Sequence, residues 1–314
     1  MSVYVRHKLN GVCREDWLAM RKEGIGGSDS SVILGLNPFT SEMELWMDKV
    51  GSMPEKPASE AMRLGNELED YVARRFCEET GKKVRRRKMM FGNTDYPWAL
   101  ANVDREIVGE CAALECKTTN PFSHFDFDSG EIPPHYYVQC CHYMAVCGYA
   151  RMYLAVLVLG KGFYHYVIER DDKEIEALMQ SESEWWDKHV VRGEMPGPDG
   201  SKSAAEAIKV LFPKAEEGES QLLYSLEGTL RQIDQLNTEI GRMEKDRDML
   251  RQQVQCAMGN AEIGISDGWK ITWKNQQSTR VDSKLLREEY PTIYAAVAKQ
   301  TSSRVLRISK KKGA

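Results

Sequence analysis

The spacing between Asp104 and Glu115 constrains this chain more than any other feature of its sequence. Gly109-Glu110, with glycine first, is typical of the two-residue loop of a type II′ β-hairpin. Counting back from that loop places Asp104 directly opposite Glu115 on the paired strand. Two carboxylates that face each other on one side of a sheet repel, so the pair is tolerated when a divalent cation lies between them.

Lys117 extends this pattern because it follows Glu115 by two residues and therefore lies on the same face of the strand. Carboxylate oxygens are hard ligands that suit Mg²⁺, and the neighbouring ammonium suits hydrolysis of a phosphodiester by a metal-assisted water. The alternative is an ordinary polar strand face, since a pattern this short also arises by chance. These three residues alone leave both interpretations open.

The chain has 314 residues and a formal net charge of −4, enough length for two modest domains with a substantial core. The total charge does not mark a nucleic-acid-binding protein, but the distribution of charge is uneven. Residues 268–314 hold 11 Lys and Arg against 3 Asp and Glu, and a second basic cluster occupies residues 82–88. Each cluster is either a solvated surface or a track for a phosphate backbone.

No hydrophobic run reaches the length of a membrane span, and the N-terminus lacks the apolar stretch of a secretory leader. We therefore expect a cytoplasmic protein with no membrane partner and with its eight cysteines reduced. Cys140, Cys141 and Cys147 lie in an apolar helical stretch and predict core thiols. An iron–sulfur site that adds Cys111 or Cys116 is disfavoured because the ligand spacing is absent.

Helical and strand patterns alternate through the first 190 residues. Residues 59–80 form an amphipathic pattern that ends at Gly81, and Pro134 opens a helix that reaches about Cys147. The apolar run 153–159 and the segment 163–169 predict a hairpin. Further helices are expected over 15–23, 42–49 and 171–191, and further strands over 98–108 and 111–118. This order predicts an α/β fold with helices around a mixed sheet.

Gly26-Gly27-Ser28-Asp29 leads into an apolar helical segment, and such a capped helix start offers free amides to an anion. A capped helix without a ligand is the commoner alternative.

The clearest linker is the Pro- and Gly-rich segment 195–201. Beyond it, residues 219–258 carry apolar side chains at three- and four-residue steps, interrupted at Arg247, which predicts a coiled-coil-like arm that needs a partner. Asp267-Gly268 predicts a tight hairpin, followed by a helix over 283–299 and a strand over 304–308. The predicted domains are 1–194, a linker with a short helix at 195–218, the arm at 219–260 and a small basic α+β module at 261–314.

Several of these segments together resemble one known family. Residues 25–39 and Glu44-Leu45-Trp46 resemble the opening of the YqaJ-type viral recombinases, which are phage nucleases of the lambda-exonuclease group in the PD-(D/E)xK superfamily. Residues 65–69 resemble the helix motif of that group. The resemblance covers about residues 14–190, and residues 219–314 resemble the tail of some phage members. It implies a restriction-endonuclease-like core with a mixed central sheet flanked by helices.

The resemblance also implies roles for individual residues. Glu69, Asp104 and Glu115, with the backbone carbonyl of Cys116, would hold one or two Mg²⁺ ions, and Mn²⁺ would substitute. Lys117 would orient and help deprotonate the attacking water, and Gln139 would support the site from the following helix. Arg21 and Ser28 resemble positions that bind a DNA 5′-phosphate. Val103 replaces the usual proline, and the neighbouring Glu67 makes the choice of Glu69 depend on alignment spacing.

The activity implied by this family is digestion of linear duplex DNA from the 5′ end, which leaves 3′ single-stranded tails. A phage strand-annealing protein would load on those tails in the bacterial host cytoplasm, the gene being of phage or prophage origin. A ring-shaped homo-oligomer, often a trimer, is also implied. The alternatives are a structure- or single-strand-directed endonuclease of the same superfamily, and a non-catalytic DNA-binding scaffold for recombination.

Overall fold

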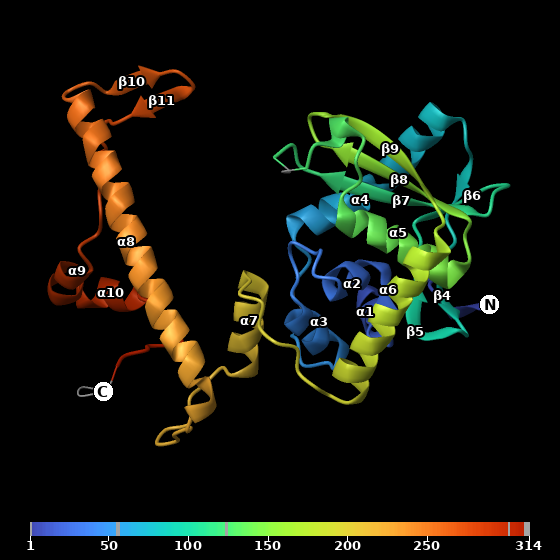
Figure 1. The fold of residues 1–314 in the computed structure, drawn as a ribbon, viewed down its shortest axis with the longest axis horizontal. Coiled ribbons are helices and arrows are strands. Elements are labelled where there is room, and N and C mark those ends of the chain that lie inside the picture. The colour runs from blue at the N-terminus through green and yellow to red at the C-terminus, as the bar shows by residue number, and fades with distance from the viewer. Residues whose placement is uncertain (1, 55–56, 123–124, 301, 311–314) are drawn as a thin grey trace. The chain divides into compact units, whose positions relative to one another are not determined.

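A computed structural model describes residues 2–54, 57–122, 125–300 and 302–310 of the chain (Figure 1). The chain divides into two compact units, Met1–Phe212 and Pro213–Ala314. The first unit is the α/β fold that the sequence predicts, with helices packed on mixed sheets.

Two sheets form the framework of the first unit. The larger sheet has the order β3-β6-β7-β8-β9, and the smaller has the order β1-β4-β5-β2. The strands of the larger sheet are β3 (Val84–Arg85), β6 (Arg105–Ile107), β7 (Ala112–Thr119), β8 (Arg151–Val158) and β9 (Gly162–Glu169). Those of the smaller sheet are β1 (Val3–Lys8), β2 (Ile25–Gly26), β4 (Met89–Asn93) and β5 (Tyr96–Ala101).

The register of β6 and β7 is the one that the hairpin pattern predicts. Arg105 pairs with Leu114 and Glu106 with Ala113 in an antiparallel ladder, so the same register extended by one step sets Asp104 opposite Glu115. The loop is longer than expected, because residues 108–111 lie outside both strands and Gly109 adopts a positive φ of 85°. The expected hairpin of β8 and β9 is confirmed as an antiparallel pair.

The segment expected as one strand over 98–108 is in fact two strands in different sheets. β5 ends at Ala101 and belongs to the smaller sheet, whereas β6 begins at Arg105 in the larger sheet. The chain crosses between sheets at residues 102–104, which places Asp104 at the junction. β1, β2 and β4, which the sequence analysis did not predict, build the rest of the smaller sheet.

Helices cover these sheets, and most lie where the sequence predicts. They are α1 (Arg14–Arg21), α2 (Gly27–Ile33), α3 (Glu42–Lys49), α4 (Glu60–Thr80), α5 (Pro134–Cys147) and α6 (Asp172–Trp185), the last continued by a π-helical turn at Trp186–Val191. Val72 and Phe76 of α4 pack on Leu114 of β7 in one core cluster. α5 carries Cys140 and Cys141 into the main core, as expected for core thiols.

α7 (Lys202–Leu211) belongs to the first unit because it packs on α3. Ala207 is buried against Met43 and Met47, and the Ser203 hydroxyl lies 3.0 Å from that of Ser41. The compact unit therefore continues beyond the Pro- and Gly-rich segment.

The second unit contains α8 (Glu227–Met258), the hairpin of β10 (Ile263–Ser266) and β11 (Trp269–Thr272), and the short helices α9 (Ser283–Glu289) and α10 (Pro291–Val297). The hairpin turns at Asp267-Gly268 as predicted. The prediction of one helix over 283–299 is wrong, because Pro291 has no amide hydrogen for a continuous helix and instead opens α10. The prediction of a strand over 304–308 is also wrong, since these described residues have no strand partner.

Candidate active site

One cavity of about 540 Å³ in the first unit collects nearly all the predicted site residues. Its lining comes from α1, α2, α4, α5, β4, β5 and β7, and from the junction that precedes β6. The predicted residues that line it are Arg21, Ser28, Glu69, Asp104, Glu115, Lys117 and Gln139. Cys116 is not among the lining residues, but its backbone amide contacts Asp104.

The Asp104 carboxyl is buried and lies close to two acidic side chains, Glu115 and Glu69. Its Oδ2 accepts a hydrogen bond of 2.8 Å from the backbone amide of Cys116. Burial, followed by the charges of Glu115 and Glu69, raises the pKa of Asp104 well above its usual range. A carboxyl in this position favours a neutralising partner, either a proton or a cation.

Glu115 is held by two side chains at one of its oxygens and by none at the other. Its Oε1 lies 2.7 Å from Lys117 Nζ and accepts a 2.7 Å hydrogen bond from Gln139 Nε2. Its Oε2 is buried and has no hydrogen-bond partner among the described residues. An unpartnered buried carboxylate oxygen is costly, so this atom is suited to bind a cation.

Lys117 completes a closed triangle with Glu115 and Gln139, because its Nζ also donates to Gln139 Oε1 at 2.9 Å. Burial alone would lower the pKa of Lys117, but the carboxylates of Glu115 and Asp104 raise it above its ordinary value. The ammonium is therefore charged as the site stands. In that form Lys117 can orient a water and stabilise negative charge, but it cannot accept a proton.

Glu69 reaches the cavity from α4, where two arginines already hold it. Its Oε1 pairs with Arg105 and lies 3.0 Å from Arg86 Nη2. No three His, Cys, Asp or Glu side chains in the described part of the chain are arranged as a ready metal cluster. The acidic centre of the site is accordingly the pair Asp104 and Glu115, and Glu69 has only its second carboxylate oxygen to offer.

This donor set fits a hard divalent cation. Oxygen ligands from Asp104, Glu115 and the Cys116 carbonyl suit Mg²⁺, which commonly binds through one or two carboxylates and keeps several waters. The raised pKa of Asp104 and the unpartnered Glu115 Oε2 both indicate that Lys117 alone does not balance the two carboxyls, so a further positive partner is favoured.

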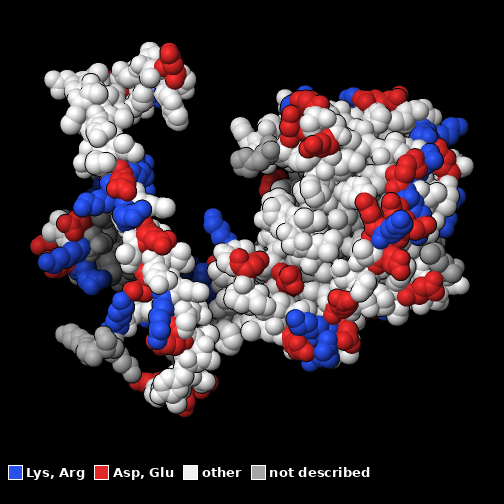
Figure 2. Space-filling model, viewed as in Figure 1, with Lys and Arg blue, Asp and Glu red and all other residues white. Residues whose placement is uncertain are grey.

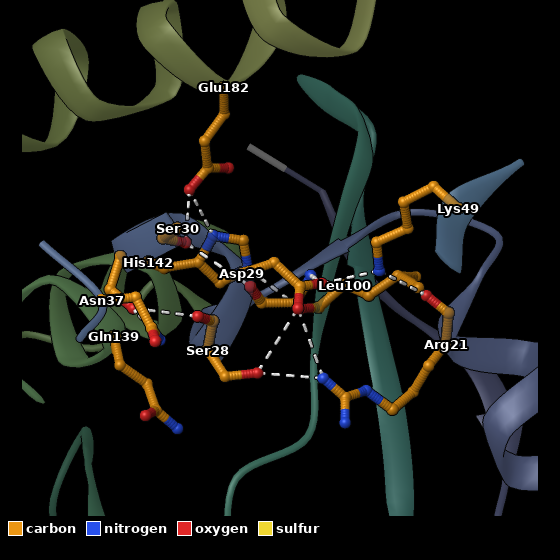
Figure 3. A network of polar contacts seen from close by, with 12 residues as sticks. Arg21, Ser28, Asp29, Ser30, Asn37, Lys49, Leu100, Gln139, His142 and Glu182 are labelled. Atoms are coloured by element: carbon orange, nitrogen blue, oxygen red, sulfur yellow. Dashed lines mark hydrogen bonds and ion pairs between the residues drawn. The ribbon is translucent and has the colours of Figure 1, made fainter. Parts of the chain in front are cut away.

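A second cluster is formed by Arg21, Ser28, Asp29 and Lys49 (Figure 3), and its Arg21 and Ser28 line the same cavity. Arg21 Nη2 donates to Ser28 Oγ at 2.9 Å and lies 3.5 Å from Asp29 Oδ1. Lys49 Nζ lies 2.6 Å from Asp29 Oδ2. Despite burial, the charges of Lys49 and Arg21 lower the pKa of Asp29. Two cations share one anion here, which leaves a net positive charge beside the Ser28 hydroxyl.

The helix that carries Ser28 is fixed from behind by a buried polar chain (Figure 3). Ser30 Oγ donates to Glu182 Oε1 at 2.6 Å, and the same oxygen lies 2.8 Å from His142 Nδ1. The approach of α2 to α5 requires glycine at position 27, because a Cβ there would lie 2.7 Å from the Tyr143 ring.

Sequence reasoning missed several residues that shape this site. Arg86 and Arg105 restrain Glu69, and Lys49 with Asp29 sets the charge around Arg21. Asp29 had a signal, since it stands three residues after Gly26 and its carboxylate accepts from the Gly26 amide at 2.8 Å. Arg86 belonged to the basic cluster at 82–88, but nothing in the sequence indicated that it would pair with an acid.

That basic cluster is largely neutralised in the fold. Arg85 and Arg87 lie 2.8 and 3.4 Å from Glu106, and Lys82 pairs with Glu110. In the face drawn in Figure 2, basic and acidic side chains are interspersed in the same way. A DNA-binding track at 82–88 would therefore have to compete with these ion pairs.

The site thus combines an Asp at a strand junction with a Glu-x-Lys on the neighbouring strand, within a mixed sheet flanked by helices. A family model described as YqaJ-like viral recombinase domain matches residues 16–150. The chain is 39% identical over 301 residues to the uncharacterized protein YqaJ of Bacillus subtilis, covering 95% of this chain and 94% of that protein. The chain belongs to the YqaJ-like viral recombinase family.

Solved structures with similar folds include an alkaline exonuclease from Laribacter hongkongensis. It is 21% identical, with a TM-score of 0.48, and the match covers 57% of this chain and 93% of that one. A phage-related exonuclease from Haemophilus somnus is 12% identical, with a TM-score of 0.44, over 57% of this chain and all of that one. No helix in the described residues has both the length and the apolar character needed to cross a bilayer.

Proposed function

We propose that this chain is a metal-dependent deoxyribonuclease that digests linear duplex DNA from its 5′ end and leaves 3′ single-stranded tails for strand annealing. The observation that carries the proposal is the buried Glu115 Oε2, which has no partner among the described residues and belongs to a side chain that lines the cavity with Asp104 and Lys117. The family supports a role in phage-type recombination. The proposed setting is the cytoplasm of a bacterial host, with a strand-annealing protein as partner.

Asp104, Glu115 and the Cys116 carbonyl would hold the metal, with Glu69 as a further ligand at its free oxygen. Mg²⁺ is the proposed ion, with Mn²⁺ as a substitute, and a second ion would require Glu69. When bound, the metal polarises the scissile phosphate and lowers the pKa of the attacking water.

The protein side chains position the reactants around that centre. Lys117, kept charged by Glu115 and Asp104, orients the water and stabilises negative charge that develops on the phosphate. Gln139 holds Glu115 and Lys117 in one arrangement by bonding to both. Arg21 and Ser28 bind the 5′-phosphate, because a guanidinium and a hydroxyl 2.9 Å apart can both contact its oxygens.

Lys49 is a positioning residue for the proposed end-binding pocket. It neutralises Asp29 at 2.6 Å and donates to the Arg21 carbonyl at 3.0 Å. Without it, Asp29 would bind Arg21 as a full ion pair and repel a phosphate. The proposed assembly is a homo-oligomeric ring, with a trimer favoured by the family resemblance.

The test uses the purified full chain with Mg²⁺ and a linear duplex labelled at either 5′ or 3′ end, against a covalently closed circle. We expect mononucleotides from the 5′ end, no cutting of the circle, and loss of activity with a chelator. Cutting of the circle would favour the endonuclease alternative. No metal-dependent cleavage of any substrate would favour the non-catalytic scaffold.

The end-binding pocket has its own test. Arg21→Ala should slow digestion of a 5′-phosphorylated duplex more than that of a 5′-hydroxyl duplex. Equal rates on the two ends with the unaltered protein would show that Arg21 and Ser28 are misassigned.

A further inference from the structure

A second cavity in the first unit, of about 460 Å³, is lined mainly by aromatic rings. Among the described residues that line it there is no Asp, Glu, Lys or Arg. Its aromatic members come from the loop after α2, the loop after β7 and the first turn of α5. They are Phe39, Phe122, Phe125, Phe127, His135 and Tyr136.

Two of these rings are exposed to an unusual degree for phenylalanine. The exposed fraction is 79% for Phe39 and 86% for Phe122. Each follows an asparagine by two residues, and the Asn37 and Asn120 side chains accept from the Phe39 and Phe122 amides at 2.9 Å. These hydrogen bonds fix the backbone at both positions, and both rings stay exposed although burial would be favoured by the hydrophobic effect.

This aromatic cavity adjoins the candidate active site through Tyr136. The Tyr136 ring lines the aromatic cavity, and its centroid lies 5.3 Å from Nζ of Lys117 on the other side. Thr119, at the end of β7, also lines the cavity and follows Lys117 by two residues. A DNA strand held at Lys117 would thus have its neighbouring nucleotides at these rings.

We propose that this aromatic cavity binds unpaired nucleobases of DNA by stacking, next to the active site. The proposal rests on the proposed function for the direction in which DNA enters, but it concerns binding and not cleavage. A flat, neutral, apolar surface suits the faces of bases, which stack on aromatic side chains without regard to sequence.

The lining also argues against a phosphate as the occupant. A phosphate needs cationic or amide donors, and the charged groups of this region lie in the active-site cavity instead. Burial and the charge of Lys117 lower the pKa of His135, which keeps this ring neutral near pH 7. The proposal therefore assigns the phosphate backbone of the strand to the active-site cavity and its unpaired bases to the aromatic cavity, with Tyr136 between the two.

The experiment measures binding of single-stranded oligonucleotides by fluorescence anisotropy, with the full chain in a chelator so that no cleavage occurs. Two probes of equal length are compared, one with normal bases and one with abasic sites throughout. Phe39→Ala and Phe122→Ala should each weaken binding of the normal strand by roughly 5- to 150-fold. Neither should change binding of the abasic strand.

Val191→Ala is the matched control, because Val191 is also exposed, at 66%, and lies outside both cavities. It should leave both probes unaffected. Thermal unfolding of each variant checks that the fold is intact, and a 2-aminopurine base in the normal strand should lose its stacking-dependent quenching in the two phenylalanine variants.

The proposal is overturned if both probes weaken equally, since that pattern reports backbone contacts. It is also overturned if binding is unchanged while the variants alter the oligomeric state, since the rings would then contact protein. The outcome is independent of the nuclease assay: a chain that cuts no DNA but prefers the normal strand keeps this inference and loses the proposed function.

Discussion

The two units of this chain differ in whether they bury their own apolar side chains. The first unit contains all the fully buried side chains of the described residues, including Met144, Leu154 and His142 at 0% exposure. The second unit has no buried residue among those described. In α8, Leu236, Ile240 and Leu250 are each more than half exposed.

The second unit also has a groove that is lined largely by apolar side chains. α8 and the β10–β11 hairpin enclose a groove of about 1160 Å³ lined by residues such as Leu250, Val254 and Trp269. In Figure 2 the end of α8 near this hairpin is largely free of charged side chains. The first unit buries its apolar side chains within its own fold. The apolar face of α8 in the second unit needs a further surface to cover it.

The largest expected effect is on the rate of cleavage, and the same substitutions should leave the first unit folded. Asp104→Ala and Glu115→Ala should abolish cleavage because each removes a proposed metal ligand, and Lys117→Ala should slow it by at least roughly 100-fold because it removes the charge that stabilises the phosphate. The fold should persist. Asp104→Asn should raise the unfolding free energy of the metal-free protein by a few tenths to about 1 kcal/mol, since it removes a like charge.

Single-turnover cleavage and urea unfolding of the same samples measure these two effects. A Lys117→Ala protein with more than about a tenth of the original rate would exclude the assigned role. Ca²⁺ should bind without supporting turnover, and Mn²⁺ should restore activity after chelation.

A chain that ends at Phe212 provides the next largest test, because it removes the whole second unit. We expect it to fold and to keep Mg²⁺-dependent cleavage, since both cavities and α7 are retained. It should digest less of a long duplex per binding event or change its oligomer size. A shortened chain of unchanged oligomer size and processivity would show that the second unit has neither role.

The sequence predicted the acidic centre well because that centre depends on local geometry. A hairpin register follows from turn position, so the opposition of Asp104 and Glu115 could be counted out before any fold was known. Helix bounds at Pro134 and Gly81 follow from equally local rules. The metal-binding and catalytic roles of these residues stay predictions.

The remaining features depend on contacts between distant segments. The ion pairs of Arg105 with Glu69 and of Lys49 with Asp29 join residues 36 and 20 positions apart, and no pattern in the sequence specifies them. The expected strand breaks at residues 102–104 because its first half pairs in the smaller sheet and its second half pairs in the larger sheet. The break at Pro291 could have been predicted from the sequence, since proline has no amide hydrogen with which to continue a helix.

A smaller effect compares the two units directly by deleting one apolar side chain in each. Met144→Ala in α5 should lower the unfolding free energy by about 2–5 kcal/mol, because Met144 is fully buried. Ile240→Ala in α8, at 52% exposure, should change it by less than about 0.5 kcal/mol in dilute solution. Urea unfolding measures both. A large loss of unfolding free energy in Ile240→Ala that depends on protein concentration would show that another copy of the chain covers the apolar face of α8.

The smallest effect is a pH dependence of the stability of the first unit. Both ring nitrogens of His142 face acceptors, with Nδ1 at 2.8 Å from Glu182 Oε1 and Nε2 at 2.9 Å from the Leu100 carbonyl. A ring that donates at both positions is protonated. Burial alone would lower the pKa of His142, but Glu182, and more distantly Asp29, raise it above its usual value.

Because the folded pKa of His142 lies above the unfolded value, its contribution to stability is complete below about pH 6.5. That contribution is lost as pH rises through the folded pKa. The difference in unfolding free energy between the unaltered protein and His142→Gln should therefore shrink from pH 6 toward pH 9. A constant difference across this range would mean that the ring is neutral in the fold and that Ser30 and Glu182 alone fix α2 in place.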